Sequence, residues 1–572
     1  MQDNVRLPGR RLWPRELACV GGVLLLWIAV WVARLDGPID LRWDASTYYV
    51  LGTSLGQDRG YRLLNEPGEI EAVQYPPLLP AFVALHQWAL GTTDMLVVGT
   101  ALRRSYFILS GLYLLAAYCL VRGFLAPPLA LVATAGTGLS FYSFLYPSDS
   151  LYAEIPFALL AMLFLLCLRR SERPAYTIAS GALAATAYLL RTAGIALLAV
   201  WVGDSLIRGR LRQAALRTVV AALPVLAWRA YTAQVTGSAA YHQPAYGYQR
   251  AAYYYSNVTY GENSWLVDPF QPERGRTSPR DLIARVGRNL VVLPRSIGES
   301  AWMAIASGPY VLDKAFRGLS LPFPAPPRSS VLNATEVCLT LLGAGALVGG
   351  AVLLGRGEWR LPLYYGASLA MISLTPWPSQ FWRYIAPLTP LSYLFFVLAL
   401  EAGARRLARR GGRWVTGASV VATVPLATIL LIQTVVAAGF LRGRLPISYY
   451  AADGTERPGR LLTYEPVWHA LDPAFEYIRR HAAPDDVVAT SVPHLAYLRT
   501  GKRSVLPPLV PDAAAAARLL DGVPASYLVL DELGVPGISE RYAEAVVARH
   551  PDDWKLVYAT PGTRVRVFER VR

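Results

Sequence analysis

Long apolar runs without charged residues are the feature that most limits what this chain can fold into. The first run, residues 17–33, contains no charged side chain, and similar runs recur as far as residue 440. Hydrophobic residues make up 54% of the 572 residues and charged residues only 16%, whereas soluble domains carry roughly 25% charged residues. Because an apolar helix of about 20 residues spans a bilayer, the pattern predicts a polytopic α-helical membrane protein.

The first apolar run also has the basic flank of a secretory signal, "RRLWPRE". A signal peptide would end in a small-x-small cleavage site, but the run is followed by "VARLDGP" and by many further apolar segments. We therefore expect residues 17–33 to remain as the first span, with the N-terminus in the cytoplasm.

The formal net charge of +16 is distributed in short clusters rather than over one surface. Examples are "RRSER", "RGRLR" and "RRLARRGGR", each beside an apolar run. This is the pattern of cytoplasmic loops in membrane proteins. A nucleic-acid-binding module would need a basic, aromatic-rich soluble segment, and we see none in the sequence.

Apolar runs and basic loops together predict about eleven spans. Residues 176–207 lie between two basic clusters, so we expect them to cross outward and return as a hairpin with Arg191 at its top. The other expected spans are residues 17–33, 105–120, 129–145, 155–168, 216–231, 337–354, 361–375, 385–400 and 415–440. An odd number of spans places the C-terminus outside. Arg103 and Arg104 then lie on the outer side, against the charge rule.

We expect two domains. Residues 1–443 form the membrane domain, with a first outer loop at 36–98 that contains an interfacial helix, and an aromatic-rich outer insertion at 235–332. The insertion suits membrane anchoring, contact with sugars, or simple packing on lipid. Residues 444–572 alternate amphipathic helices with short apolar strands and end in a hairpin, "WKLVYAT" and "VRVFERV". This pattern predicts a small α/β domain outside a prokaryotic cytoplasmic membrane.

Acids and arginines converge on the expected outer face. Asp44 lies in "RWDASTYY", Asp149 and Glu154 lie in "YPSDSLYAEIPF", Arg191 lies in "LLRTAG", and Arg383 lies in "PSQFWRYIAPLTP". An acid in an outer loop is often only solvated, and an arginine at a span end often only reaches for the interface. An arginine within an apolar run is costly, however, and usually functional or paired.

The order of these motifs resembles the GT-C class of integral membrane glycosyltransferases. In particular it resembles the branch of protein O-mannosyltransferases and lipid A aminoarabinose transferases. The matching stretches are "WDASTYYVLGTSLGQDRGY", "YPPLLPAFVALHQWALG", "SDSLYAEIPF", "LLRTAG" and "FWRYIAPLTPLSYL". The resemblance implies a GT-C-like membrane domain that moves a sugar from a polyprenyl-phosphate donor to an acceptor on the outer face.

The resemblance also assigns roles to residues. The acid of the first outer loop carries over to Asp44 as general base, with inversion at the anomeric carbon. Glu154 matches the acid before "PF" better than Asp149 does, and which of the two is functional stays open. The substrate loop would comprise Tyr48, Tyr75, Pro76 and Pro77.

Arginine binds phosphate through two parallel hydrogen bonds, so Arg191 and Arg383 are expected to bind the donor phosphate. The aminoarabinose-transferase branch has a lysine directly before its Pro-Pro step, where this chain has Tyr75. The cationic role would then pass to Arg62 or to the later arginines.

Other functions stay open from the sequence. We expect no cofactor; a divalent metal on Asp44, Asp149 and Glu154 is a minor alternative. A transporter or flippase of lipid-linked sugar would use the same arginines without a base, and a non-catalytic scaffold is a third possibility. His494 is expected to be a capping or packing residue. The acceptor is a glycan, a lipid or a protein hydroxyl.

Overall fold

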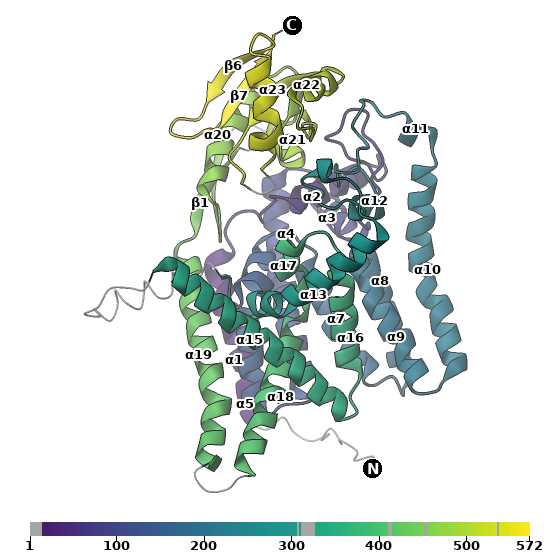
Figure 1. The fold of residues 1–572 in the computed structure, drawn as a ribbon, viewed down its shortest axis with the longest axis vertical. Helices are drawn as coiled ribbons and strands as arrows, with labels where there is room; N and C mark the ends of the chain where they lie inside the picture. The colour runs from purple at the N-terminus through teal and green to yellow at the C-terminus, as the bar shows by residue number, and fades with distance from the viewer. Residues whose placement is uncertain are drawn as a thin grey trace, which may run out of the picture.

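The computed structural model describes residues 14–305, 308–309, 327–409, 414–450, 455–534 and 537–571. Figure 1 shows a bundle of long helices covered at one end by a C-terminal unit of strands and short helices, drawn in yellow. The large hydrophobic core lies within the bundle, and two smaller cores lie within the C-terminal unit. The chain is therefore a mostly helical integral membrane protein with a sheet-containing C-terminal region.

Most of the long helices follow the expected apolar runs. In the first half they are α1 (Pro14–Trp31), α4 (Met95–Arg122), α5 (Pro127–Leu139), α7 (Glu154–Leu168), α8 (Pro174–Leu190), α9 (Ile195–Ile207) and α10 (Leu211–Thr236). In the second half they are α13 (Pro279–Ala301), α15 (Arg328–Gly355), α16 (Arg360–Ser373), α18 (Thr389–Ala408) and α19 (Trp414–Arg442). Shorter helices between them along the chain are α2 (Asp44–Gly56), α3 (Leu78–Leu90), α6 (Tyr146–Asp149), α11 (Ala239–His242), α12 (Tyr260–Ser264) and α17 (Phe381–Ile385).

The expected count of eleven spans is not confirmed. Within the described part of the chain, five helical segments are long and apolar enough to cross a bilayer, or six if one bent pair forms a single span. That pair, Pro127–Leu139 and Phe141–Asp149, bends by 71°. Several other apolar helices are short; α7, for example, has 15 residues, fewer than the roughly 20 that a straight span requires.

Residues 176–207 form the expected hairpin, with Arg191 at the turn. Helix α8 ends at Leu190, Arg191 is extended (φ −156°, ψ 131°), and α9 begins at Ile195. The turn is tight at Gly194, where a Cβ atom would lie 2.3 Å from the backbone nitrogen of Tyr188. Only glycine leaves room for this return, which holds Arg191 between the two helices.

Helix α13 lies within the expected outer insertion, and the sequence did not predict it. Its backbone touches α15: a Cβ on Gly298 would lie 2.1 Å from the carbonyl oxygen of Leu339, and one on Gly343 would lie 1.9 Å from that of Pro294. Glycines allow this close helix contact. The insertion thus packs against the membrane bundle instead of forming only a loop.

The C-terminal region contains two sheets. Strands β1 (Leu445–Tyr450) and β2 (Glu456–Leu461) pair antiparallel directly after α19. A five-stranded sheet follows in the order β4-β3-β5-β7-β6. Its strands are β3 (Val487–Ala489), β4 (Arg503–Val505), β5 (Ala525–Leu530), β6 (Trp554–Ala559) and β7 (Arg566–Arg570), and the helices between them are α20 (Pro466–His481), α21 (Pro493–Thr500), α22 (Ala513–Asp521) and α23 (Glu544–Arg549). Strands β6 and β7 form the predicted closing hairpin.

Candidate active site

A cavity of about 810 Å³ lies between the membrane bundle and the C-terminal region. Its lining comes from the start of α2, the loop before α3, the α8–α9 turn, α10, the aromatic insertion, α16, α17 and the start of α21. Four charged residues line it: Asp44, Arg191, Arg229 and Arg383. Segments that are far apart in the sequence therefore bring one acid and three arginines into the same space.

Asp44 is held at the first position of α2 by an unusual turn. The preceding residue, Trp43, has a φ of +57°, a backbone conformation that is costly for a bulky side chain. The Trp43 ring packs edge-on against Trp468 of α20, with 5.1 Å between centroids. Packing on the C-terminal region thus maintains the turn that directs Asp44 into the cavity.

The Asp44 carboxylate has two polar partners. Its Oδ2 lies 2.8 Å from Nη1 of Arg383, and its Oδ1 accepts a hydrogen bond of 3.2 Å from the Tyr75 hydroxyl. Burial and the neighbouring Asp44 carboxylate hold the pKa of Tyr75 well above its usual value, so Tyr75 remains a donor. The ring of Tyr48 packs edge-on against Tyr75 at 4.9 Å and fixes its direction.

Glu154 lies behind the cavity wall and binds two of the arginines. Its Oε1 accepts from Nε of Arg383 at 2.5 Å and from Nη1 of Arg191 at 3.2 Å. The side chain is only 1% exposed, and Oε2 is buried without a hydrogen-bond partner among the described residues. The rings of Tyr152 and Tyr384 lie against Arg383 and Arg191 at 4.1 and 5.3 Å. Glu154 therefore orients both guanidinium groups.

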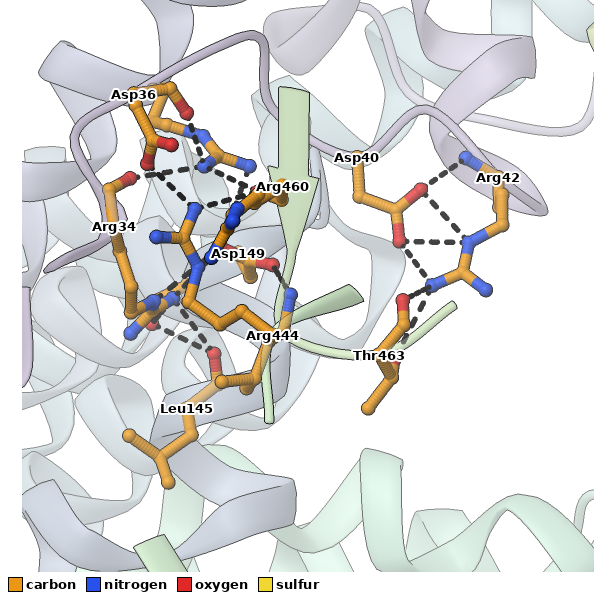
Figure 2. A network of polar contacts seen from close by, with 12 residues as sticks. Arg34, Asp36, Asp40, Arg42, Leu145, Asp149, Arg444, Arg460 and Thr463 are labelled. Atoms are coloured by element: carbon orange, nitrogen blue, oxygen red, sulfur yellow. Dashed lines mark hydrogen bonds and ion pairs between the residues drawn. The ribbon is translucent and has the colours of Figure 1, made fainter. Parts of the chain in front are cut away.

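Asp149 lies outside this cavity, in a buried cluster that joins the bundle to the C-terminal region (Figure 2). Its Oδ1 is 3.3 Å from Nη2 of Arg34 and 3.5 Å from Nη2 of Arg103. Its Oδ2 accepts from the backbone nitrogen of Leu462 at 2.7 Å. Nη1 of Arg103 also donates to the carbonyl oxygens of Arg34, Asp36 and Arg460. Arg103, whose expected position on the outer side conflicted with the charge rule, thus forms a buried ion pair with Asp149.

Backbone pairing connects this cluster to the candidate active site. The nitrogen of Asp40 donates to the Asp149 carbonyl at 2.9 Å, and the nitrogen of Leu151 donates to the Asp40 carbonyl at 3.0 Å. Nearby, Arg42 binds the Asp40 carboxylate and donates to the Thr463 carbonyl at 2.5 Å (Figure 2). It also donates to Glu465 at 2.7 Å. The segment before Asp44 is thereby fixed to the turn before Glu154.

Tyrosines from the insertion cover the cavity. Tyr253, Tyr254, Tyr255 and Tyr260 all line it, and Tyr260 packs edge-on against Trp377 at 5.5 Å. The sequence left open whether this segment anchors in the membrane, contacts sugars or packs on lipid. The structure places part of it at the cavity. Aromatic faces of this kind suit the apolar faces of sugar rings.

No protein-family model and no curated protein matches this chain, but solved structures do. An oligosaccharyltransferase from Archaeoglobus fulgidus, tethered with an acceptor peptide, is 12% identical with a TM-score of 0.47, over 97% of this chain and 74% of that one. ArnT from Cupriavidus metallidurans, bound to undecaprenyl phosphate, is 14% identical with a TM-score of 0.45, over 97% and 98%. AglB from Archaeoglobus fulgidus, in complex with an inhibitory peptide and a dolichol-phosphate, is 13% identical with a TM-score of 0.46, over 97% and 74%.

The similar structures are GT-C glycosyltransferases. They are of the class that the sequence motifs indicate. With identities of 12–14% and TM-scores of 0.45–0.47, we take no residue role from these likenesses. The roles proposed below depend on the side chains of the cavity.

The other expected site residues are divided. Tyr48, Tyr75 and Pro76 line the cavity, whereas Pro77 precedes α3 and Arg62 lies in the surface of the loop. The Arg62 side chain is 40% exposed, 3.8 Å from Glu71, and donates to the Glu69 carbonyl at 3.1 Å. The structure therefore does not place Arg62 in the cavity with Arg191 and Arg383.

Arg229 is a cavity residue that the sequence reasoning missed. It lies in α10 and lines the cavity, and within the described residues it has no ion-pair or hydrogen-bond partner for its side chain. The rule that singled out Arg191, an arginine within an apolar run, applies equally to "LAWRAY". Arg229 is the cavity arginine that needs no acid to be displaced before it binds an anion.

The three acids of the alternative metal site do not come together in the structure. Asp149 lies in the separate cluster, and Glu154 and Asp44 are bound to arginines. In the described ranges no three His, Cys, Asp or Glu side chains lie together in a way that could hold a metal ion. His494, which was expected to be a capping or packing residue, lies in the cavity wall.

Proposed function

We propose that this protein is a glycosyltransferase that moves a sugar from a polyprenyl-phosphate donor to an acceptor hydroxyl, with Asp44 as general base. The observation that carries this proposal is the contact of 2.8 Å between Asp44 and Arg383 in a large cavity lined by aromatic residues. Displacement at an anomeric carbon needs a base for the attacking hydroxyl and a cation for the leaving phosphate, and the cavity offers both kinds of group.

The chemistry assigned to Asp44 is a single displacement. The acceptor oxygen attacks the anomeric carbon, Asp44 takes its proton, and the bond from that carbon to the phosphate oxygen breaks. Polyprenyl phosphate leaves with the bonding electrons. Glu154 is buried behind the arginines, so the described cavity offers one acid to substrate, whereas a retaining mechanism uses two carboxyl groups about 5 Å apart. We therefore propose inversion of the anomeric centre.

The three arginines are proposed to bind the donor phosphate. Arg383 and Arg191 are held ready by Glu154, and Arg229 is free to bind. The leaving phosphate gains negative charge as the bond breaks, and fixed cations stabilise that charge in the transition state. Arg383 contacts Asp44, so donor phosphate would compete with the Asp44 carboxylate for the same guanidinium.

Placement in the membrane is part of the proposal. The membrane domain would comprise residues 1–443, with a cytoplasmic N-terminus, and residues 444–572 would lie outside a prokaryotic cytoplasmic membrane. Eleven spans remain the expectation from the sequence. The cavity would then face the outer leaflet, where a polyprenyl-phosphate sugar presents its headgroup.

The first test separates an enzyme from a transporter or flippase. Purified protein in lipid nanodiscs is given a panel of polyprenyl-phosphate hexoses and pentoses with crude cell-envelope extract as acceptor, and free polyprenyl phosphate is measured. We expect release from at least one donor. A carrier protein would bind the donor and leave its sugar–phosphate bond intact, which would contradict the proposal.

A further inference from the structure

One side of the cavity is formed by the C-terminal region. We call it the acceptor wall, and it consists of Ser491, Val492, Pro493, His494, Leu506, Leu509 and Ile538. Helix α21, which begins at Pro493, packs against α2, which begins at Asp44. The acceptor wall and the proposed base therefore line the same cavity.

His494 is a buried polar side chain without a partner. The residue is 5% exposed and lines the cavity. Its Nε2 atom is fully buried and has no hydrogen-bond partner among the residues that the structure describes. A buried polar group left unpaired is destabilising. Because Nε2 has no accessible surface, a ligand in the cavity supplies the missing hydrogen bond only when the imidazole ring turns toward the cavity.

The start of α21 adds backbone donors to the same place. Val492 precedes the helix and provides no side-chain cap, and Pro493 at the first position has no N–H group. The free N–H groups of a helix start therefore begin at His494 itself. The helix has eight residues, and its N-terminal end lies in the cavity wall.

Ser491 supplies a hydrogen-bond acceptor. Its hydroxyl donates to Oδ2 of Asp531 at 2.5 Å, and the Ser539 hydroxyl donates to the same oxygen at 2.9 Å. Because the Ser491 proton is directed away to Asp531, its oxygen lone pairs remain for a ligand. Together with the α21 start, the wall offers both donors and an acceptor.

The acceptor wall is uncharged, unlike the rest of the cavity. None of its seven residues is Arg, Lys, Asp or Glu, and burial lowers the pKa of His494 to about 3, so the imidazole is neutral at pH 7. The three cavity arginines come from other elements: the α8–α9 turn, α10 and α17. A phosphate or carboxylate would find no cation on this wall, whereas hydroxyl groups, which both donate and accept, match it.

Aromatic rings flank this neutral wall. Trp43 and Tyr254 line the cavity and both pack into the hydrophobic cores of the C-terminal region. The Tyr254 hydroxyl accepts from the backbone nitrogen of Leu506 at 2.8 Å, which ties its ring to the wall. Hydroxyl-binding groups beside aromatic faces are the features that recognise a sugar ring.

We infer that the acceptor is a neutral glycan, and that Ser491 and His494 bind the hydroxyls of its sugar ring while Asp44 faces the attacking hydroxyl. This inference rests on the proposed function, since it names the acceptor of the same reaction. Ser491 and His494 are assigned to binding the acceptor and not to breaking the donor bond.

The test uses the full chain in nanodiscs, with three kinds of acceptor probe: neutral methyl glycosides and disaccharides, the same glycosides carrying a phosphate, and serine-containing peptides. The variants are Ser491→Ala and His494→Phe, with His494→Gln as a polar replacement. Ser539→Ala is the matched control, because it removes the other hydroxyl from Asp531 and lies outside the lining of the cavity.

We expect transfer to neutral glycosides, with the KM for the glycoside raised about 3- to 10-fold by Ser491→Ala and by His494→Phe, the loss of one hydrogen bond in each case. His494→Gln should recover part of the loss, and Ser539→Ala should leave KM within about twofold. Preference for the phosphorylated glycosides or the peptides, or an unchanged KM in both variants, would overturn the inference.

Binding separates this inference from the proposed function. Isothermal titration of the neutral glycosides needs no donor, and we expect binding by wild type that is weaker in Ser491→Ala. If wild type releases no polyprenyl phosphate from any donor but binds glycosides in this way, the proposed reaction fails and the acceptor wall stands. If donor is turned over and no glycoside binds, the inference is wrong.

Discussion

Nη1 of Arg383 lies 2.8 Å from Oδ2 of Asp44, at the centre of the cavity's charges. Nε of the same guanidinium lies 2.5 Å from Oε1 of Glu154. One side chain from α17 therefore connects the acid at the start of α2 with the acid at the start of α7. The geometry needs a planar group with several donors, which arginine has and lysine lacks.

Replacing Arg383 by lysine should remove this connection while keeping the charge. We expect Arg383→Lys to lower kcat for polyprenyl phosphate release by about 100-fold or more, the scale for removing one group that stabilises transition-state charge. Arg405→Lys is the control, because Arg405 is 53% exposed and, within the described part of the chain, pairs with Glu401. Activity in Arg383→Lys above half of wild type would contradict a role for the guanidinium.

Glu154→Gln should act through the arginines. The substitution keeps the size of the side chain but leaves Arg191 and Arg383 without their buried acid, and breaking a buried ion pair costs about 3–5 kcal/mol. We expect a lower melting temperature in nanodiscs and a higher KM for the donor. Glu401→Gln, at a more exposed pair, should change neither. A Glu154→Gln protein with wild-type stability and donor KM would show that the arginines are positioned by something else.

Asp149→Asn should weaken the junction in Figure 2 and leave the chemistry intact. Arg34 and Arg103 are both fully buried and share Asp149, so the loss is again about 3–5 kcal/mol. We expect a lower melting temperature and faster proteolysis between α19 and α20, with the donor KM unchanged in the folded fraction. Asp36→Asn is matched to it: its partner Arg444 is buried but Asp36 is 57% exposed, so the cost should be below about 1 kcal/mol. A stable Asp149→Asn protein without transfer activity would instead make Asp149 part of the reaction.

His494 should make the fold sensitive to acid. Burial lowers the pKa of its imidazole from 6.5 to about 3, so the unfolded chain binds the extra proton between these values and the folded chain does not. Stability from His494 is therefore complete above pH 6.5 and falls as the pH is lowered, by about 2 kcal/mol at pH 5. We expect the melting temperature of His494→Phe to decline less than that of wild type between pH 7 and pH 5. His481→Phe, at an exposed position, should keep the wild-type slope; equal slopes in all three proteins would contradict the burial of a neutral imidazole.

Local patterns predicted much of the fold. The apolar runs correspond to helices from α1 to α19, the hairpin has Arg191 at its turn, and β6 and β7 close the C-terminal sheet. The count of spans could not be predicted, because bent and short helices such as α5 and α7 do not have the length from which a span is recognised. Helix α13 was missed because arginines such as Arg285 and Arg288 interrupt its apolar residues.

The sequence predicted which types of residue form the site, but not which residues each of them binds. Asp149 and Glu154 are five positions apart in one turn, yet one points to Arg34 and Arg103 and the other to Arg191 and Arg383. That division depends on which distant arginines fold against each acid, and spacing carries no such information. The sequence predicted a capping or packing role for His494 but not its position in the cavity wall. That position depends on the contact of α21 with α2, which joins segments more than 400 residues apart in the sequence.

The most direct test of the account is the single-turnover rate of polyprenyl phosphate release by wild type, Asp44→Asn and Asp94→Asn, with the active donor and saturating acceptor. Asparagine at position 44 keeps the shape of the side chain and cannot take the proton. Asp94 caps α4 through hydrogen bonds from Leu96 and Val97, which asparagine also accepts. We predict a rate about 100- to 10,000-fold lower in Asp44→Asn, the range for removing a general base, and an unchanged rate in Asp94→Asn. An Asp44→Asn rate within about tenfold of wild type would contradict the role of Asp44 as the base.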